Sequence, residues 1–287
     1  MHEELAILFP GQGSHTDGMR EAVERVDPGL AELAEAEAGA DPFPRAGEST
    51  RYAQPAILTT SLALWIGAGR PGAACFAGHS LGELGALAAA GAIETHDAIR
   101  LAALRGRLMD SAARRSPGGM VALLGDRDEA AAVADVAGVA VANDNGPTQT
   151  VLAGPLEALV TAVDEAKARG LRAMRLPVAG AFHSPAMEPA VEPFREALAE
   201  VRIVPPAAPV VSCSSATPFE DPAEIRERLA AALVSPVRWR ETLDRIRARG
   251  VTRFVETGPG KALTGMVRRA LDGVEASVLE VGGIAHV

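Results

Sequence analysis

Short apolar runs alternate with longer stretches of helical periodicity over the first 113 residues. Residues 5–9 and 73–77 are apolar throughout, as expected of strands that are buried on both faces. Residues 19–26, 30–38, 54–66, 81–90 and 95–113 have the composition and spacing of helices. Strands that alternate with helices predict a mostly parallel sheet covered on both faces.

The rhythm changes over residues 118–180. Strands are expected at 120–124, 139–142, 150–153 and 171–176, helices at 128–136 and 156–168, and a turn at 143–147. The resulting β-α-β-β-α-β order is that of a ferredoxin-like unit. We therefore predict a small lobe at 118–180, inserted into a large lobe made of residues 1–117 and 181–287.

The pattern of the large lobe resumes after a loop at 177–185. Helices are expected at 186–201, 225–234, 237–249 and 262–271, with strands at 209–214, 253–256 and near Val278. The whole chain thus reads as an α/β protein with two lobes.

Ser80 lies at the predicted strand-to-helix turn, between Gly78 and Gly82. This G-x-S-x-G spacing is typical of a nucleophile elbow, in which a tight turn between glycines exposes the serine hydroxyl. The helix expected from Leu81 points its first N–H groups and its positive dipole end at the reacting atoms. The alternative is a serine that caps the helix after a glycine turn.

A nucleophilic serine needs a general base. His183 lies in an apolar, glycine-kinked loop, residues 179–185, where a base could be held rigidly; a histidine satisfied in the core is the alternative. The other histidines have weaker contexts. They are His2 and His286 near the ends, His15 in a loop, His96 in the first turn of a helix, and His79, whose place beside Ser80 suits a supporting role.

Arg105 emerges beside an apolar helix face that carries Leu101, Leu104 and Leu108. A buried guanidinium needs an anionic partner, because an unpaired buried charge is costly. The partner could be a carboxylate of the protein or a substrate carboxylate, which the planar fork binds with two hydrogen bonds.

Composition excludes several classes of function. The chain of 287 residues is 48% hydrophobic, with a net charge of −9 and no basic run, so we expect no binding to nucleic acid or to an anionic membrane. No apolar segment approaches the roughly 20 residues that span a bilayer. The acidic N-terminus does not resemble a signal peptide, and Cys75 and Cys213 read as buried thiols. We expect a soluble, cytoplasmic protein without a metal site.

Five ordered motifs carry a resemblance to a known family. They are LFPGQGS (8–14), GHSLGE (78–83), LRGRLM (104–109), GAFHS (180–184) and ETGPGKAL (256–263). Together they resemble the malonyl-CoA:acyl-carrier-protein transacylases, and the free-standing acyltransferases of fatty acid and polyketide synthesis are similar. The resemblance implies an α/β-hydrolase-like large lobe and a ferredoxin-like small lobe.

The resemblance also implies roles for individual residues. Ser80 would be the nucleophile and His183 its base, the backbone N–H groups of Gln12 and Leu81 would form the oxyanion hole, and Arg105 would bind the malonyl carboxylate. A backbone carbonyl from residues 235–239 would steady the histidine in place of an aspartate.

Three further residues bear on specificity or depart from the family pattern. Phe182 resembles the residue of malonyl-selective members, in which its bulk would crowd an α-methyl branch. Arg238 stands where the family commonly has Gln, and Leu84 where an aromatic residue often follows the glutamate. Neither departure touches a catalytic role.

The expected reaction is malonyl transfer from malonyl-CoA to the phosphopantetheine thiol of an acyl carrier protein, without a cofactor. Residues 236–270 contain nine cationic residues against three acidic ones, a basic region that could steer an acidic carrier. The alternatives are an acyl hydrolase, an acyltransferase for a non-malonyl group in polyketide synthesis, and a non-catalytic subunit that binds the carrier.

Overall fold

A six-stranded sheet forms the centre of the large lobe in the computed structural model, which describes residues 4–280 and 283–285. Its order is β10-β9-β8-β1-β2-β7, and every neighbouring pair is parallel except β9 with β10. The strands are β1 (Leu5–Phe9), β2 (Cys75–Gly78), β7 (Val210–Val211), β8 (Arg253–Glu256), β9 (Glu275–Glu280) and β10 (Gly283–Ala285). The mostly parallel sheet is confirmed, although the strand expected at 209–214 is much shorter.

Helices cover both faces of this sheet. Along β1, Leu5, Ile7 and Phe9 face one apolar cluster, while Ala6 and Leu8 face the other. The first cluster includes α1 (Met19–Glu24), α2 (Pro28–Ala38), α3 (Thr50–Gly67), α4 (Gly82–Ala89), α5 (Thr95–Arg115), α8 (Glu188–Glu200) and α9 (Pro222–Ala231). The second includes α10 (Trp239–Arg247) and α11 (Ala262–Ala270). The continuous apolar runs of the strands follow from this double burial.

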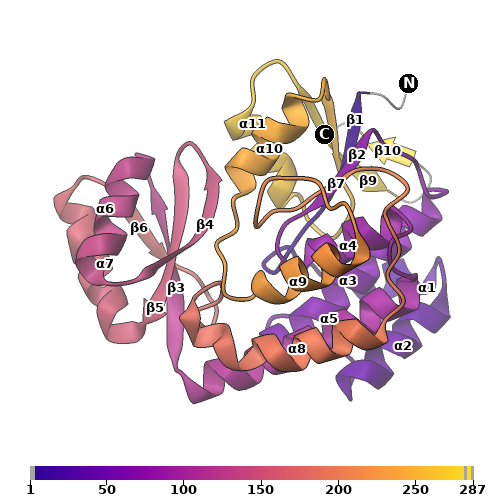
Figure 1. Ribbon diagram of the computed structural model, residues 1–287, viewed down its shortest axis with the longest axis horizontal. Coiled ribbons are helices and arrows are strands. Elements are labelled where there is room, and N and C mark those ends of the chain that lie inside the picture. The colour runs from indigo at the N-terminus through magenta and orange to yellow at the C-terminus, as the bar shows by residue number, and fades with distance from the viewer. Residues whose placement is uncertain (1–3, 281–282, 286–287) are drawn as a thin grey trace.

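A second, four-stranded antiparallel sheet forms the small lobe, to the left in Figure 1. Its order β4-β5-β3-β6 is that of a ferredoxin-like unit, as predicted. Its elements are β3 (Gly118–Leu124), α6 (Arg127–Ala137), β4 (Ala140–Gly146), β5 (Gln149–Pro155), α7 (Leu156–Ala168) and β6 (Arg172–Arg175). All of them fall within residues 118–180; the lobe boundaries themselves stay a prediction.

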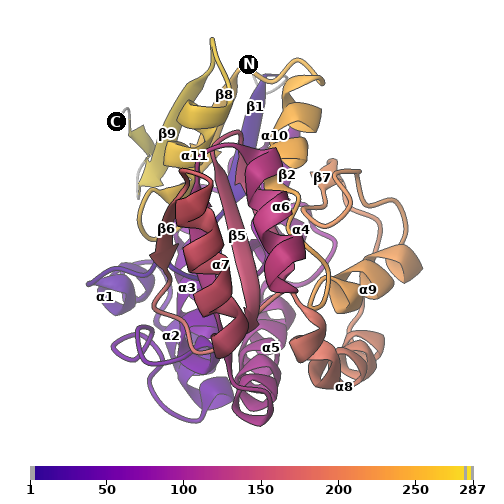
Figure 2. The same cartoon turned by 90° about the vertical axis from the view of Figure 1, so that its left-hand side faces the viewer.

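The two faces of the small sheet pack into two different apolar cores. Val121, Leu123 and Leu152 pack with α6 and α7, which lie in front of the sheet in Figure 2. Ala122 and Val151 instead join the main apolar cluster of the large lobe. The period-2 alternation of strand side chains therefore builds the contact between the lobes.

The turn expected at 143–147 is wrong. Residues 143–146 belong to β4, with irregular register after Val141 and after Asp144. Asn and Asp favour turns locally. Here the strand continues because Asn143 also forms a parallel bridge with Val237, a residue of the large lobe that local sequence does not reveal.

Several helix starts also differ from expectation. Helix α3 begins at Thr50 rather than Gln54, so Pro55 lies inside it. Helix α9 begins at Pro222, because Asp221 accepts hydrogen bonds from the N–H groups of Ala223 and Glu224. Helix α10 begins at Trp239 instead of Val237. The helix expected at 186–201 is a 3₁₀ turn, η1 (Pro185–Met187), followed by α8.

Candidate active site

The turn between β2 and α4 is a sterically enforced elbow. Ser80 has a φ of 52°, in the left-handed region that few non-glycine residues adopt. A Cβ on Gly78 would lie 1.9 Å from the carbonyl carbon of Gly82, and a Cβ on Gly82 would lie 2.0 Å from the carbonyl oxygen of Phe9. Only glycine fits at both positions. The strand, the turn and the helix expected around Ser80 are all present.

Ser80 and His183 form a hydrogen-bonded pair. Ser80 Oγ lies 2.7 Å from His183 Nε2, and His183 is only 5% exposed. His183 Nδ1 lies 2.9 Å from the carbonyl oxygen of Ala232 and 3.1 Å from that of Ser235. Because carbonyls only accept hydrogen bonds, Nδ1 must carry the proton, which leaves Nε2 free to accept the serine proton.

The surroundings of His183 keep its imidazole neutral. Burial, reinforced by the positive charge of Arg105, lowers the pKa of His183 to about 3. Both causes penalise the charged imidazolium. At neutral pH the ring is therefore in the basic form that proton abstraction requires.

Arg105 completes a buried polar group around the serine hydroxyl. It is 4% exposed, and its Nη2 donates to Ser80 Oγ at 3.1 Å while its Nη1 donates to Gln54 Oε1 at 2.8 Å. Burial lowers the pKa of Arg105 to about 10, so it stays cationic at neutral pH. Within residues 4–280, no carboxylate lies in ion-pair distance of this guanidinium.

Gln54 is a site residue that the sequence did not reveal. Its side chain is fully buried, accepts from Arg105 and donates to Thr50 Oγ1 at 2.8 Å. The available signal was a polar residue within an apolar helix. Its partner Arg105 is 51 residues away, and only folding brings the two together.

The loop after β7 holds the elbow through hydrogen bonds to Ser80 and Glu83. Cys213 Sγ accepts a hydrogen bond from the N–H of Ser80 at 3.3 Å. Glu83, which is 1% exposed, accepts from Ser212 Oγ and from the N–H of Cys213, each at 2.8 Å. Burial raises the pKa of the Glu83 carboxyl and that of the Cys213 thiol. Cys75 and Cys213 are free and buried, as expected.

The two segments proposed for the oxyanion hole lie at the elbow. Leu81 directly precedes α4, where the first N–H groups of a helix have no intrahelical acceptor. Gln12 is exposed in the loop after β1, and this loop packs on the elbow, since a Cβ on Gly11 would lie 2.6 Å from the carbonyl oxygen of His79.

The remaining site candidates take different places. Phe182 is buried and directly precedes His183 in the chain. Its ring packs on Gly180, where an added Cβ would lie 2.7 Å from the ring. His79 Nε2 bonds to Asn145 Oδ1 at 2.8 Å rather than to the serine. His15 and His96 are exposed, while His2 and His286 lie outside the described residues.

Comparison with known proteins identifies the family. Residues 44–285 match the acyl transferase domain family. The malonyl CoA-acyl carrier protein transacylase of Salmonella typhimurium is 38% identical over 295 aligned positions, covering 96% of each chain. This chain belongs to the malonyl CoA-acyl carrier protein transacylase family.

Solved structures agree with this assignment. The malonyl CoA-acyl carrier protein transacylase of Coxiella burnetii superposes with a TM-score of 0.91 at 32% identity, covering 97% of this chain and 94% of that one. A malonyl-transacylase in complex with its type II polyketide synthase acyl-carrier protein superposes at 0.89, with 33% identity and 96% of each chain covered.

The transacylase resemblance led us to expect a carbonyl from residues 235–239 behind the histidine. Ser235 supplies one, but the second comes from Ala232, just after α9, which the sequence did not indicate. The carbonyl of Arg238 accepts instead from the N–H of Thr242 at 2.9 Å, and the Arg238 side chain pairs with Glu241. The Arg that replaces Gln therefore does not contact the dyad.

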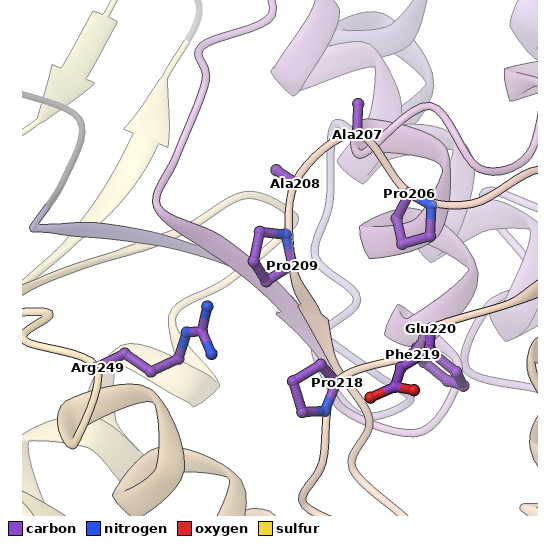
Figure 3. Close-up of a pocket in the computed structure, with 8 residues that line it drawn as sticks. All are labelled: Pro206, Ala207, Ala208, Pro209, Pro218, Phe219, Glu220 and Arg249. Atoms are coloured by element: carbon purple, nitrogen blue, oxygen red, sulfur yellow. The ribbon is translucent and has the colours of Figure 1, made fainter.

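A surface pocket of about 230 Å³ lies away from this transacylase site. Figure 3 shows its lining around the start of β7: Pro206, Ala207, Ala208, Pro209, Pro218, Phe219, Glu220 and Arg249. Pro209 precedes β7 and its carbonyl accepts from Phe76 in β2, whereas Ser80 follows the other end of β2. The pocket is thus at the end of the sheet where the parallel strands begin, whereas Ser80 is at the end where they finish.

Neither a metal cluster nor a membrane span is found in the described part of the chain. Residues 4–280 and 283–285 contain no group of three or more His, Cys, Asp or Glu side chains that could hold a metal ion. No helix in these ranges is long and apolar enough to cross a bilayer.

Proposed function

We propose that this chain transfers a malonyl group from malonyl-CoA to the phosphopantetheine thiol of an acyl carrier protein. The observation that carries the proposal is the buried Arg105 guanidinium, 3.1 Å from Ser80 Oγ and with no carboxylate of residues 4–280 within ion-pair distance. A malonyl thioester attacked by Ser80 has its carboxylate one methylene from the reacting carbonyl. A cation beside the nucleophile suits such a short diacid.

The first half-reaction forms an acyl-enzyme. Ser80 Oγ attacks the thioester carbonyl while His183 Nε2 takes its proton. The N–H groups of Gln12 and Leu81 stabilise the tetrahedral oxyanion; one such donor is worth about 2.7–4 kcal/mol. The intermediate collapses to the malonyl-serine ester, and the CoA thiolate leaves with the proton from His183.

The second half-reaction reverses these roles. The carrier thiol gives its proton to His183 and attacks the ester, and Ser80 recovers a proton as it leaves. Every step uses groups of this chain and of its two substrates, so we propose that no resident cofactor takes part. Kinetics should be ping-pong. We place the reaction in the cytoplasm because free thiols suit a reducing compartment.

Phe182 is proposed to narrow the acyl pocket. Its buried ring is next to His183 and packs against Gly180, so it has little freedom to retreat from a branched acyl group. An α-methyl branch on the malonyl group would then meet the ring.

We propose that only part of the basic region, residues 236–270, steers the carrier. Helices α10 and α11 both begin near the carboxyl edge of the sheet, where Ser80 lies, and run back toward its amino edge. The cations that start or precede these helices, Arg238, Arg240 and Lys261, therefore lie toward the active site, whereas Arg249 and Arg269 do not. Arg238 and Arg240 are paired with Glu241 and Asp144. Lys261 is exposed, and we propose it as the main steering charge.

The first experiment is the intact mass of the protein after brief incubation with malonyl-CoA, acetyl-CoA or no donor. We expect a malonyl adduct on the wild type and on Ser116→Ala, an exposed control, but none on Ser80→Ala. Absence of any adduct on the wild type would favour the hydrolase or the non-catalytic carrier-binding subunit.

The second stage adds a phosphopantetheinylated carrier to the isolated adduct. Transfer of the malonyl mass to the carrier supports the transacylase, whereas release of free malonate identifies a hydrolase. Lys261→Glu should raise the KM for the carrier several-fold at low salt and leave malonylation by malonyl-CoA unchanged. Arg269→Glu, exposed at the far end of α11, the helix that Lys261 precedes, is the matched control; equal effects of the two variants would reject the assignment.

A further inference from the structure

The end of β4 crosses from the small lobe onto the segment that orients His183. The N–H of Val237 donates to the carbonyl of Ala142, and the N–H of Asp144 donates to the carbonyl of Val237, each at 2.8 Å. Ser235, which lies two residues before Val237, holds His183 Nδ1 through its carbonyl. Residues 142–144 thus fix the backbone that places the base.

The same stretch also reaches the nucleophile. Asn145 Oδ1 bonds to Nε2 of His79, the residue directly before Ser80. The rings of His79 and Trp239 pack against each other in a T-shaped arrangement, with their centroids 5.3 Å apart. Residues 142–145, the brace, therefore contact the supports of both Ser80 and His183.

Asp144 fastens this brace to both lobes. It is 6% exposed, and its Oδ2 accepts from Arg240 Nε at 3.1 Å and Nη2 at 2.9 Å, as well as from Arg127 Nε at 3.0 Å. Arg127 begins α6 of the small lobe, whereas Arg240 belongs to α10 of the large lobe, which lies beside β4 in Figure 1. A buried carboxylate is tolerated only with such partners, so the ion pairs fix where the brace lies.

We propose that Asp144 is a positioning residue for the dyad, which it holds in register across the lobes through its ion pair with Arg240. The inference rests on the proposed function for its kinetic readout. Displacement of the brace moves the Ser235 carbonyl away from Nδ1 of His183. It also removes the Asn145 hydrogen bond that holds His79, the residue next to Ser80. Misplacement by about 1 Å far from the reacting atoms can lower a rate by about 10²-fold.

The test compares Asp144→Asn, Arg240→Gln and the double variant in the full chain. We expect kcat for malonylation of Ser80 to fall about 10-fold or more in each, with the KM for malonyl-CoA within about threefold. Because the two residues act as a unit, the double variant should be no worse than the poorer single variant. Glu129→Gln, which removes an ion pair with Arg169 inside the small lobe, should leave kcat unchanged.

A second readout is independent of turnover. The Nδ1–H signal of His183 in protein with ¹⁵N-labelled histidine should be sharp in the wild type and broadened by solvent exchange in the variants. A folded Asp144→Asn protein with wild-type kcat, or a lower kcat with an unchanged Nδ1–H signal, would overturn the proposal. If Asp144→Asn does not fold, Arg240→Gln decides by the same criteria. A wild type that forms no adduct would contradict the proposed function. The comparison of Nδ1–H signals between wild type and variants would still test the brace.

Discussion

The two members of the dyad have the same unusual backbone conformation but are held in opposite ways. Ser80 has a φ of 52° and His183 a φ of 57°. The serine is fixed by close contacts of Gly78 and Gly82, both within two residues of it. The histidine is fixed by carbonyls 49 and 52 residues away. The nucleophile is positioned by tight backbone packing around its flanking glycines, part of it against Phe9 of β1, whereas the base is positioned by hydrogen bonds to distant carbonyls.

This difference predicts where each residue is vulnerable. A left-handed backbone at a non-glycine residue costs about 1–3 kcal/mol and persists only where the surroundings enforce it. At Ser80 the surroundings are mainly backbone, that of the elbow and that of the central strand β1, so damage to the elbow should damage the fold. At His183 they are distant hydrogen bonds, so activity should be lost before stability.

The largest effect is expected from Gly82→Ala. The added Cβ would lie 2.0 Å from the Phe9 carbonyl oxygen in the central strand, and neither backbone can give way. We expect a loss of more than about 4 kcal/mol in the free energy of unfolding, in the exceptional range for one substitution. Chemical denaturation measures it. Gly72→Ala, which meets nothing within 4 Å, should stay within about 1 kcal/mol of the wild type.

His183→Gln should separate activity from stability. Loss of the base should slow malonylation of Ser80 about 10²–10⁴-fold, the usual contribution of a general base. The glutamine side chain remains polar, so we expect the free energy of unfolding to change by less than about 2 kcal/mol. Rapid-quench mass spectrometry and denaturation check the two values. A variant that unfolds as readily as Gly82→Ala would contradict the contrast between the two residues.

Arg105→Ala should change which acyl group is transferred. Loss of two charge-assisted hydrogen bonds to the carboxylate should lower malonyl transfer relative to acetyl transfer by about 100-fold. Removal of the cation should also let the pKa of His183 rise, which shifts the acid limb of the pH–rate profile upward. Parallel assays with both donors measure the ratio. Arg114→Ala, exposed at the end of the same helix, should leave ratio and pH profile unchanged.

The most gradual effect, and the smallest over a single pH unit, is a pH dependence of stability. Because the folded-state pKa of His183 is about 3, below its ordinary value, the unfolded chain binds this proton more readily. The stability of the folded protein is therefore undiminished above about pH 6.5 and falls as the pH drops toward 3, by up to about 1.4 kcal/mol per pH unit. The wild type minus His183→Gln isolates this part from the opposite contributions of Glu83 and Glu256, whose pKa values are raised. Identical slopes for both proteins would exclude a buried neutral His183.

The sequence by itself determined the features that arise within a few residues. The apolar runs of β1 and β2, the glycines around Ser80 and the ferredoxin-like order of the small lobe are local patterns, and each is present in the structure. Arg105 was also identifiable from the sequence, because a cation beside an apolar helix face needs an anionic partner.

Only the tertiary structure decided how these parts are held together. Gln54 behind Arg105, Ala232 behind His183 and Val237 beside Asn143 are contacts between residues far apart in sequence. The last of these contacts accompanies the extension of strand β4 over residues 143–146, where a turn was expected. Local propensities differ by about 1 kcal/mol per residue, whereas burial of polar groups and charges without partners costs more. The long-range partners therefore override the local preference, and one sequence alone does not show which residues they are.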